Sequence, residues 1–302
     1  MWKLNNTEKN IVCRRYIRGD SAPAIAADYD VSAPAIIGIL SRRGVPRRTR
    51  RGAQKHLPLK ETAFSSPTPE ALYWAGFLMA DGSIFGNTLA LTLSDKDSAH
   101  VSAFRVFLGS GHALTKIHQS PSAPAIRLAV RSEALIHDLA RWGVLPNKTF
   151  TALAKEEAIR SKDFWRGVVD GDGWVAMVHQ KPYFNKHHKI NAWSRPYDMP
   201  RLQLVGAEPL MHQFLQFVHS VVPSCKVTVR HHKSIFSVGL GWLPAACVIQ
   251  ELYYDGCIGL QRKVNSARNI LSLAESWLRP SAGTSHASES SVGMATGPVW
   301  NR

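Results

Sequence analysis

Two aspartates, Asp81 and Asp172, are the residues whose types and positions first suggest chemistry. Each ends an apolar, helix-favouring run, and the glycine that follows, Gly82 or Gly173, is expected to cap that helix in the left-handed conformation. The C-terminal end of a helix carries partial negative charge, so a carboxylate there is unfavourable unless a cation lies nearby. Hard oxygen ligands suit Mg²⁺. One Asp-Gly pair would be an ordinary helix end, but two in matching stretches favour a metal site.

The stretches that carry these aspartates are versions of one pattern, YWAGFLMADG over residues 73–82 and FWRGVVDGDG over residues 164–173. An internal repeat changes which folds are worth considering, because each copy then forms an equivalent unit. Both runs contain small residues that would let two helix backbones approach closely, namely Gly76, Ala80, Gly167 and Gly171. We therefore expect the two helices to pack together and to bring Asp81 close to Asp172 at a pseudo-twofold axis.

The segments around these stretches repeat one order of elements. In the first repeat, residues 70–150, the pattern predicts helices over 69–80, 98–108 and 132–142 and strands over 83–85, 88–94, 112–118 and 126–131. In the second repeat, residues 151–280, it predicts helices over 163–171, 208–221 and 243–253 and strands over 174–179, 201–205, 225–230 and 234–240. Each repeat is therefore αββαββα, and the predicted fold class is α+β with two pseudo-symmetric repeats of antiparallel sheet.

Three further segments complete this body. A polar, aromatic-rich insertion at 180–200 takes the place of the tight hairpin that Gly86 and Asn87 predict in the first repeat. A last helix is predicted over 264–278. The Ser-, Gly- and Thr-rich residues 281–302 are predicted to be a disordered tail.

The polar residues of the predicted strands are basic or uncharged, and none of them is acidic. Because alternate strand residues point to opposite faces, the polar members can be separated from the apolar ones. A sheet with one dry face shows such alternation in any case. The bias is that no acidic residue occurs in the polar set, which suits a sheet lying on a polyanion and reading the major groove. The set comprises Thr88, Thr92, Lys116, His118, Arg127, Arg131, Arg201, Gln203, Lys226, Thr228 and Arg230.

The overall composition points the same way. The chain has 302 residues, a formal net charge of +15 and a pI of about 9.9, which favours partners that carry phosphate. An anionic membrane surface is the weaker alternative, because no apolar run is long enough to span a bilayer and no signal peptide is recognisable. The 4 cysteines show no metal-binding spacing, which favours a reducing compartment. We expect a protein that is not secreted, either cytoplasmic and nucleoid-associated or organellar or phage-encoded.

Residues 1–45 form a separate all-α module. Three helical patterns occur, and the last two each open with Ser-Ala-Pro-Ala-Ile, in which Ser21 or Ser32 can cap the helix and the proline tolerates its first turn. The length and spacing of these helical patterns resemble a helix-turn-helix of the resolvase or regulator type. In such a motif the helix from Ser32 to Arg43 would enter the major groove. A plain three-helix bundle is the alternative, and the positive charge favours the DNA-binding interpretation.

A basic linker is predicted over residues 46–69. An arginine-rich run that begins just before it cannot pack on itself, so it is either a solvated tether or an arm that lies along phosphates, and the two interpretations are compatible. The run contains Arg42, Arg43, Arg47, Arg48, Arg50 and Arg51.

Residues 70–278 resemble the single-chain, two-repeat LAGLIDADG homing endonucleases, in the paired motif and in the order of elements. The resemblance implies a saddle of two antiparallel sheets that grips DNA. It places Asp81 and Asp172, with the adjoining Ala80 and Gly171, in the metal-binding positions. Lys148 and Lys263, in the segments closing each repeat, fall where the family often has a lysine near the attacking water. Asp170 and Met79 occupy the other, non-catalytic acidic position of the motif, where Met79 departs from the family's lettering.

The function expected from this resemblance is a metal-dependent double-strand break at a long, non-palindromic DNA site. The cofactor would be Mg²⁺, with Mn²⁺ able to substitute, and the partner would be double-stranded DNA. The protein is expected to act as a monomer, with no obligate protein partner and no membrane. Two alternatives remain open, a non-catalytic DNA-binding transcription regulator on the same fold and an intron RNA maturase. An intein is not expected, because the chain lacks an initial Cys or Ser and a terminal His-Asn.

Overall fold

The computed structural model describes residues 4–47, 57–117, 124–147, 151–180, 183–184, 191–193 and 196–278. The chain divides into two compact units, Met1–Lys60 with Gly109–His112, and the remainder, and each is described by itself. Several predicted positions lie outside the described residues, namely Arg48, Arg50, Arg51, His118, Lys148 and the tail 281–302.

In the described residues of the N-terminal unit, three short helices surround a small apolar core. They are α1 (Asn6–Arg18), α2 (Ala22–Asp28) and α3 (Ala33–Arg42). The side chains of Ser21 and Ser32 accept hydrogen bonds from the backbone of Ala24 and Ala35, so the predicted serine caps are confirmed. Asn5 and Glu8 form a capping box at the start of α1. The core is formed by Leu4, Val12, Tyr16, Ala22, Ile25, Ala26, Ile36, Ile39 and Leu40.

The two serine-capped helices meet at a sharp angle. The chain bends by 108° between α2 and α3, which lies within the range found in helix-turn-helix motifs. Among the described residues no single helix is long and apolar enough to cross a membrane, and α2 with α3 meets the length and composition criteria only as this bent pair.

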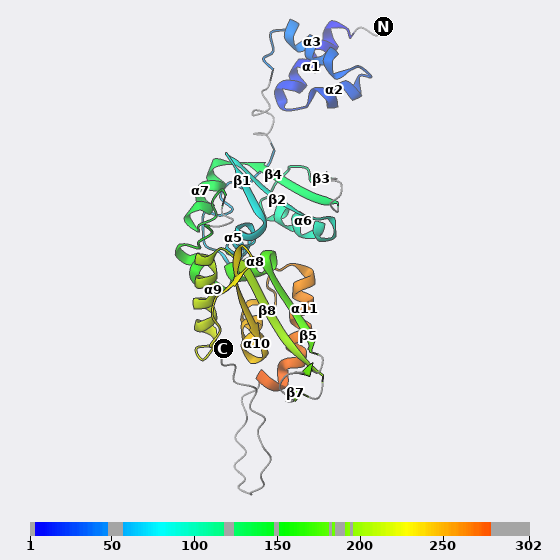
Figure 1. Cartoon of the computed structure of the whole chain (residues 1–302). Coiled ribbons are helices and arrows are strands. Elements are labelled where there is room, and N and C mark those ends of the chain that lie inside the picture. The colour runs from blue at the N-terminus through cyan, green and yellow to red at the C-terminus, as the bar shows by residue number, and fades with distance from the viewer. Residues whose placement is uncertain are drawn as a thin grey trace, which may run out of the picture. The chain divides into compact units, whose positions relative to one another are not determined.

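The first repeat is a four-stranded antiparallel sheet in the order β1-β2-β4-β3 (Figure 1). Gly86 has a φ of 53° in the turn after β1, so the predicted hairpin is confirmed. The elements are α5 (Pro69–Asp81), β1 (Gly82–Phe85), β2 (Thr88–Ser94), η1 (Asp95–Asp97), α6 (Ser98–Phe107), β3 (Thr115–Ile117), β4 (Ala125–Arg131) and α7 (Glu133–Arg141).

The second repeat has the same topology. Its sheet order β5-β8-β10-β9 matches the first when the strands are taken in chain order. The elements are η2 (Glu156–Arg160), α8 (Lys162–Asp172), β5 (Gly173–Gln180), β8 (Tyr197–Gly206), α9 (Glu208–Val221), β9 (Arg230–His232), β10 (Ile235–Gly241), α10 (Trp242–Leu252) and α11 (Gln261–Leu278). The insertion forms its own pair of strands, β6 (Tyr183–Phe184) and β7 (Asn191–Trp193). The α+β fold with two αββαββα repeats is confirmed.

One predicted strand lies in a different place. The strand expected over 225–230 is observed as β9, which pairs Arg230–His232 with β10. Exposure still alternates before it, with Lys226 and Thr228 more exposed than Val227 and Val229. The alternation identified the face of this segment correctly. The position of the strand depends on the hydrogen-bonding partner, which periodicity does not specify.

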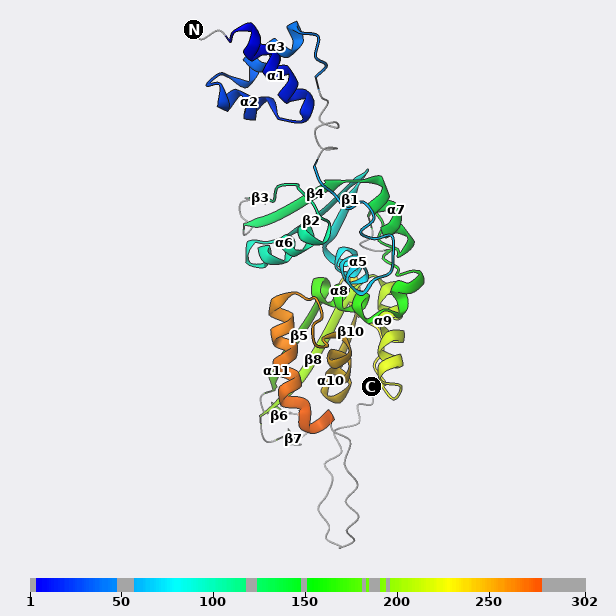
Figure 2. The same cartoon turned by 180° about the vertical axis from the view of Figure 1, so that it is seen from behind.

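The two motif helices pack against each other in the middle of the body. Both views show α5 and α8 side by side between the two sheets (Figures 1 and 2). Glycines make this contact close, since a Cβ on Gly76 would lie 2.0 Å from the Phe164 carbonyl oxygen, and one on Gly167 would lie 2.1 Å from that of Tyr73. The predicted role of these small residues in helix approach is confirmed.

Gly76→Ala is expected to lower the free energy of unfolding of this body by at least about 2 kcal/mol, because the new methyl group meets backbone that no rotamer change can move. Gly239→Ala is the matched control, since its Cβ would meet no atom within 4 Å, and it should change stability by less than about 0.5 kcal/mol. Urea unfolding of both variants measures the difference. Equal stability of the two variants would contradict the close contact.

Candidate functional site

The two aspartates close the helices that meet at the centre. Asp81 is the last residue of α5 and Asp172 the last of α8, and both are exposed. A Cβ on Gly171 would lie 2.2 Å from the Ala80 Cβ and 3.4 Å from Asp81 Oδ2. The carboxylate from the first repeat therefore lies against the last turn of the helix that carries the second. The structure thus brings Ala80 and Asp81 of the first repeat against Gly171, the residue before Asp172.

The glycines after the aspartates have another role than the one expected. Gly82 has φ −76° and Gly173 φ −96°, so neither is left-handed, and the predicted left-handed caps are wrong. The chain instead passes from each helix directly into a strand. A Cβ on Gly82 would lie 2.6 Å from the Leu78 oxygen, and one on Gly173 would lie 2.6 Å from the Val169 oxygen. Glycine is required here because the backbone folds closely onto the last helical turn.

Lys263 extends from the first turn of α11 to the end of α8. Its side chain is 3% exposed, and Nζ donates to the carbonyl oxygens of Val169 (2.6 Å), Asp170 (2.7 Å) and Gly173 (2.6 Å). An ammonium has three donors, and these bonds use all of them. The lysine thus places a cation at the negative end of the helix that carries Asp172.

The charge on Lys263 is also coupled to the aspartates. Burial lowers the pKa of Lys263 to about 8, and Asp170, Asp81 and Asp172 oppose that shift by attraction. At neutral pH the group is therefore still an ammonium. The same side chain responds to Asp81 and Asp172, so one buried cation acts on both carboxylates.

Lys263→Met, which keeps the length of the side chain, is expected to lower the free energy of unfolding by about 2–3 kcal/mol, since it removes three charge-assisted bonds to buried carbonyls. Lys162→Met on α8 is the control. Its ion pair with Glu251 is exposed, and its loss should cost less than about 1 kcal/mol. Denaturant unfolding at pH 7 compares the two, and similar losses would contradict a helix-capping role for Lys263.

A fully buried carboxylate, Asp170, lies beneath the exposed pair. It accepts hydrogen bonds from the hydroxyls of Tyr73 (2.8 Å) and Tyr253 (2.7 Å) and from the backbone N–H of Leu260 (2.7 Å). Burial raises the pKa of Asp170, and these donors and the charge of Lys263 oppose the rise. Tyr73 belongs to the first repeat and Asp170 to the second, so the carboxylate joins the two halves. Its position is structural.

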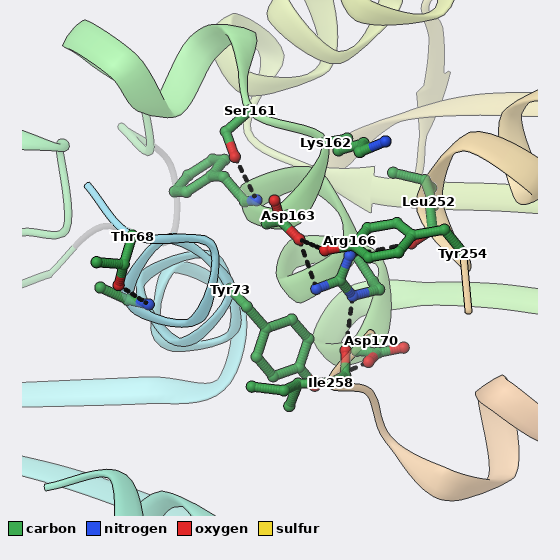
Figure 3. Close-up of polar contacts among 12 residues, drawn as sticks. Thr68, Tyr73, Ser161, Lys162, Asp163, Arg166, Asp170, Leu252, Tyr254 and Ile258 are labelled. Carbon is green, nitrogen blue, oxygen red and sulfur yellow. Dashed lines mark hydrogen bonds and ion pairs between the residues drawn. The ribbon is translucent and has the colours of Figure 1, made fainter. Parts of the chain in front are cut away.

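Arg166 forms a second buried polar cluster that sequence reasoning did not identify. Its guanidinium pairs with Asp163 (2.8 Å) and donates to the carbonyl oxygens of Ile258 (2.6 Å) and Leu252 (3.1 Å). Figure 3 shows this guanidinium beside Asp163 and Tyr254, whose hydroxyl also donates to Asp163. The signal available in the sequence was an arginine within an otherwise apolar helical run, at the position where the first repeat has Ala75.

His100 extends the network of Asp170 into the first repeat. Its Nε2 lies 2.9 Å from the Tyr73 hydroxyl oxygen, and that hydroxyl donates to Asp170, so the ring is assigned as neutral with the proton on Nε2. Burial lowers the pKa of His100 from 6.5 to about 4. The folded protein therefore binds fewer protons than the unfolded chain between these two pH values.

Stability is accordingly expected to fall as the pH decreases from 6.5 to about 4, with His100 contributing up to about 3 kcal/mol of the loss, because the unfolded chain takes up the proton first. His100→Gln keeps a donor toward Tyr73 and cannot titrate, so it should remove this part of the loss. The unfolding midpoint as a function of pH tests the prediction. An identical acid dependence in both proteins would show that His100 is not responsible.

The outer face of the first sheet carries two arginines. Arg127 is paired directly with Thr92, and Arg131 with Thr88, and both arginines are exposed. The predicted separation of these residues from Leu128 and Val130 is confirmed by burial. Lys116 is exposed but pairs with Ile126, so it belongs to the opposite face from Arg127. Its predicted grouping with these arginines is wrong, because a shift of one residue in register exchanges the faces.

The outer face of the second sheet is built in the same way. Arg201 is paired with Ala176 and Gly241, and Gln203 with Trp174 and Gly239. Leu202 and Leu204, which alternate with them, are buried. Arg230 pairs with Ser237, which places it on the same face. Lys226 and Thr228 are exposed in the segment before β9.

The described arginines of the predicted arginine-rich run are exposed at the end of α3 and beyond it. Arg42 donates to the Gly38 carbonyl, and Arg43 donates to the side chains of Asn10 and Asn6, which ties α3 to α1. Arg47 is exposed. The side chain of Arg43 thus already has a structural role within its own unit.

Comparison with known proteins gives likeness in structure only. No family model matches the chain, and no curated relative matches it. Similar solved structures include the LAGLIDADG meganuclease I-AabMI bound to uncleaved DNA, with a TM-score of 0.47 and 9% identity over 70% of this chain and 91% of that one. The LAGLIDADG homing endonuclease I-GzeII in complex with its DNA target has a TM-score of 0.45 and 11% identity over 70% of this chain and 92% of that one. The LAGLIDADG meganuclease I-CpaMI bound to uncleaved DNA has a TM-score of 0.46 and 11% identity over 70% and 93%.

Proposed function

We propose that the chain is a divalent-metal-dependent DNA endonuclease of the LAGLIDADG homing type, which makes a double-strand break at a long, non-palindromic site. One observation carries the proposal. Each repeat contributes one exposed aspartate, Asp81 or Asp172, at the end of a helix, and the two helices are in backbone contact. Two equivalent carboxylates related by a pseudo-twofold axis suit a substrate with two antiparallel strands. Because the repeats differ in sequence, the two half-sites of the DNA should differ as well.

The residues present suit Mg²⁺. Among the described residues no group of three or more His, Cys, Asp or Glu side chains could hold a metal. Mg²⁺ does not require such a group, since it commonly binds one or two carboxylates together with water and substrate phosphates. Asp81 and Asp172 would be its carboxylate ligands, with Ala80 and Gly171 beside them, and Mn²⁺ could substitute. When bound, the ion would polarise the scissile phosphate and favour loss of a proton from water.

The protein's own residues then have separate tasks. Asp81 and Asp172 would supply the carboxylates that bind the cation, and the buried ammonium of Lys263 fixes the helix end that carries Asp172. Arg127, Arg131, Arg201 and Arg230, on the outer faces, would bind phosphates or base edges, with Thr88, Thr92, Gln203, Lys226 and Thr228 around them. Duplex DNA is the proposed partner. Both halves belong to one chain, so a monomer suffices.

The structure describes Lys263 but not Lys148, so different roles are proposed for these two lysines. Lys148 lies outside the described residues, and its role near the attacking water stays a prediction. The same role was predicted for Lys263, whose three donors are directed at backbone carbonyls. A group in this position acts through the helix end, so we propose that Lys263 is a positioning residue for Asp172.

One observation favours a regulator as the second candidate. The N-terminal unit has two serine-capped helices at 108°, with Arg42 exposed in the second and Arg47 exposed beyond it. This arrangement is compatible with a helix-turn-helix that binds DNA without cutting it. Retention of both exposed aspartates favours the nuclease. The same aspartates separate the two candidates experimentally.

Asp81→Asn and Asp172→Asn are each expected to lower the double-strand cleavage rate at least about a hundredfold, since each removes a carboxylate ligand of the cation that would offset the developing phosphate charge. DNA affinity should be retained, because the lost charge is negative. Cleavage of a randomised duplex library in Mg²⁺ and in EDTA, read by sequencing the cut ends, measures the effect. Asp198→Asn alters an exposed carboxylate elsewhere and should leave cleavage intact. Full cutting by either site variant would overturn the assignment, and absence of cutting by the unmodified chain would favour the regulator.

Arg127→Ala is expected to weaken DNA binding and to reduce the slope of log affinity against log salt by about 1, as expected for the loss of one phosphate contact. Lys116→Ala should change neither quantity, because the register places that side chain on the opposite face. Fluorescence anisotropy on a mixed-sequence duplex at several salt concentrations tests the pair. Equal losses would mean that the outer face is not the surface that binds DNA.

A further inference from the structure

The two halves of the candidate site differ at the residue two positions after each aspartate. In the second repeat this residue is Trp174, and in the first it is Ser83. Trp174 is 48% exposed, and Ser83 is also exposed. Strand geometry places each of them about 6–7 Å along the chain from its aspartate. A large aromatic residue therefore follows one aspartate of the pair at this spacing, and a small hydroxyl residue follows the other.

The register shows which way Trp174 faces. It is paired directly with Gln203 in β8, so it lies on the outer face that carries Arg201. Its neighbour in the sequence, Val175, is buried on the other face. Trp174 is thus on the basic side of the sheet, the side proposed to meet DNA.

The described strand positions around Gln203 and Arg201, apart from Trp174, carry small residues. Gln203 is paired on its other side with Gly239, and a Cβ on Gly239 would meet no atom within 4 Å. Arg201 is likewise paired with two small residues, Ala176 and Gly241. Among the described residues, the cross-strand partners of Gln203 and Arg201 other than Trp174 are therefore all small. This leaves room for a flat partner such as a nucleobase.

A half-exposed indole on a basic face fits the chemistry of DNA. Proteins that bind the minor groove of DNA frequently insert apolar side chains between base steps and partly unstack them. Stacking of a base on an aromatic ring contributes about 1–3 kcal/mol and is tolerant of sequence. Trp174 follows Asp172 by two residues in the sequence, so the distorted step would lie near the phosphate cleaved at that half of the site.

We infer that Trp174 is a wedge that stacks on a base at the second half-site and holds that part of the duplex partly unstacked. The inference rests on the proposed function. It assigns unequal roles to the two equivalent positions, since Ser83 cannot stack. DNA that is already unstacked at the centre would bind more tightly, because the protein would not have to spend binding energy on opening it.

The test compares a mixed-sequence duplex with the same duplex carrying a central two-base mismatch, both in EDTA so that no cleavage occurs. The unmodified chain is expected to bind the mismatched duplex with about tenfold higher affinity, because part of the free energy of unstacking one base step is then no longer needed. Trp174→Thr, in which the β-branched threonine suits a strand, should lose this preference. Leu273→Gln is the control, since Leu273 is 55% exposed on α11, and it should retain the preference.

The outcomes separate this inference from the function on which it rests. Salt-dependent binding of both duplexes, with the same preference in the chain with and without Trp174, would overturn the wedge and leave the nuclease proposal standing. Binding of neither duplex would overturn the nuclease proposal and the wedge together. Circular dichroism melting of Trp174→Thr confirms folding, and Trp174→Phe, which keeps a ring, should retain part of the preference.

Discussion

The close contact between α5 and α8 is the constraint on which the rest of the body depends. Where Gly76 meets the backbone of Phe164 and Gly167 meets that of Tyr73, no side chain separates the two helices. Contact of this kind sets the distance between the helix ends, and therefore between Asp81 and Asp172, without relying on rotamers. Preorganised geometry is what electrostatic catalysis needs, because little reorganisation is then left for the moment of reaction.

Burial of charge next to this contact is offset by a dense set of hydrogen bonds. Asp170 has three donors, Arg166 has Asp163 and two carbonyls, and Lys263 has three carbonyls. A buried polar group without partners would be costly, whereas a satisfied network fixes one arrangement of the elements. In the described part of the body, the buried side-chain atom Trp74 Nε1 lacks a hydrogen-bond partner. These hydrogen bonds fix the orientation of the helix ends, in addition to the packing of α5 against α8.

Much of this could be predicted from the sequence, for identifiable reasons. The duplicated Asp-Gly stretches predicted the repeats, and strand alternation predicted that Arg127, Arg131 and Arg201 lie on the outer faces, because both patterns are local. The face of Lys116, the position of β9 and the conformation of Gly82 were predicted incorrectly. Each depends on a partner distant in the chain or on the path that the backbone takes after a helix. The roles of Lys263 and Arg166 were not predicted from the sequence either, since they donate to backbone carbonyls, which carry no signature in the sequence.

The origin of the cation under Asp172 has a consequence for how the protein is made. Lys263 belongs to α11, which follows all the strands of both sheets. A ribosome delivers the chain from its N-terminus, so the sheets and both motif helices are available before the residue that completes the end of α8. The nascent chain therefore carries an incomplete site until its last described helix has docked. Correct arrangement of the paired aspartates becomes a late step in maturation, after most of the surface that would bind DNA has formed.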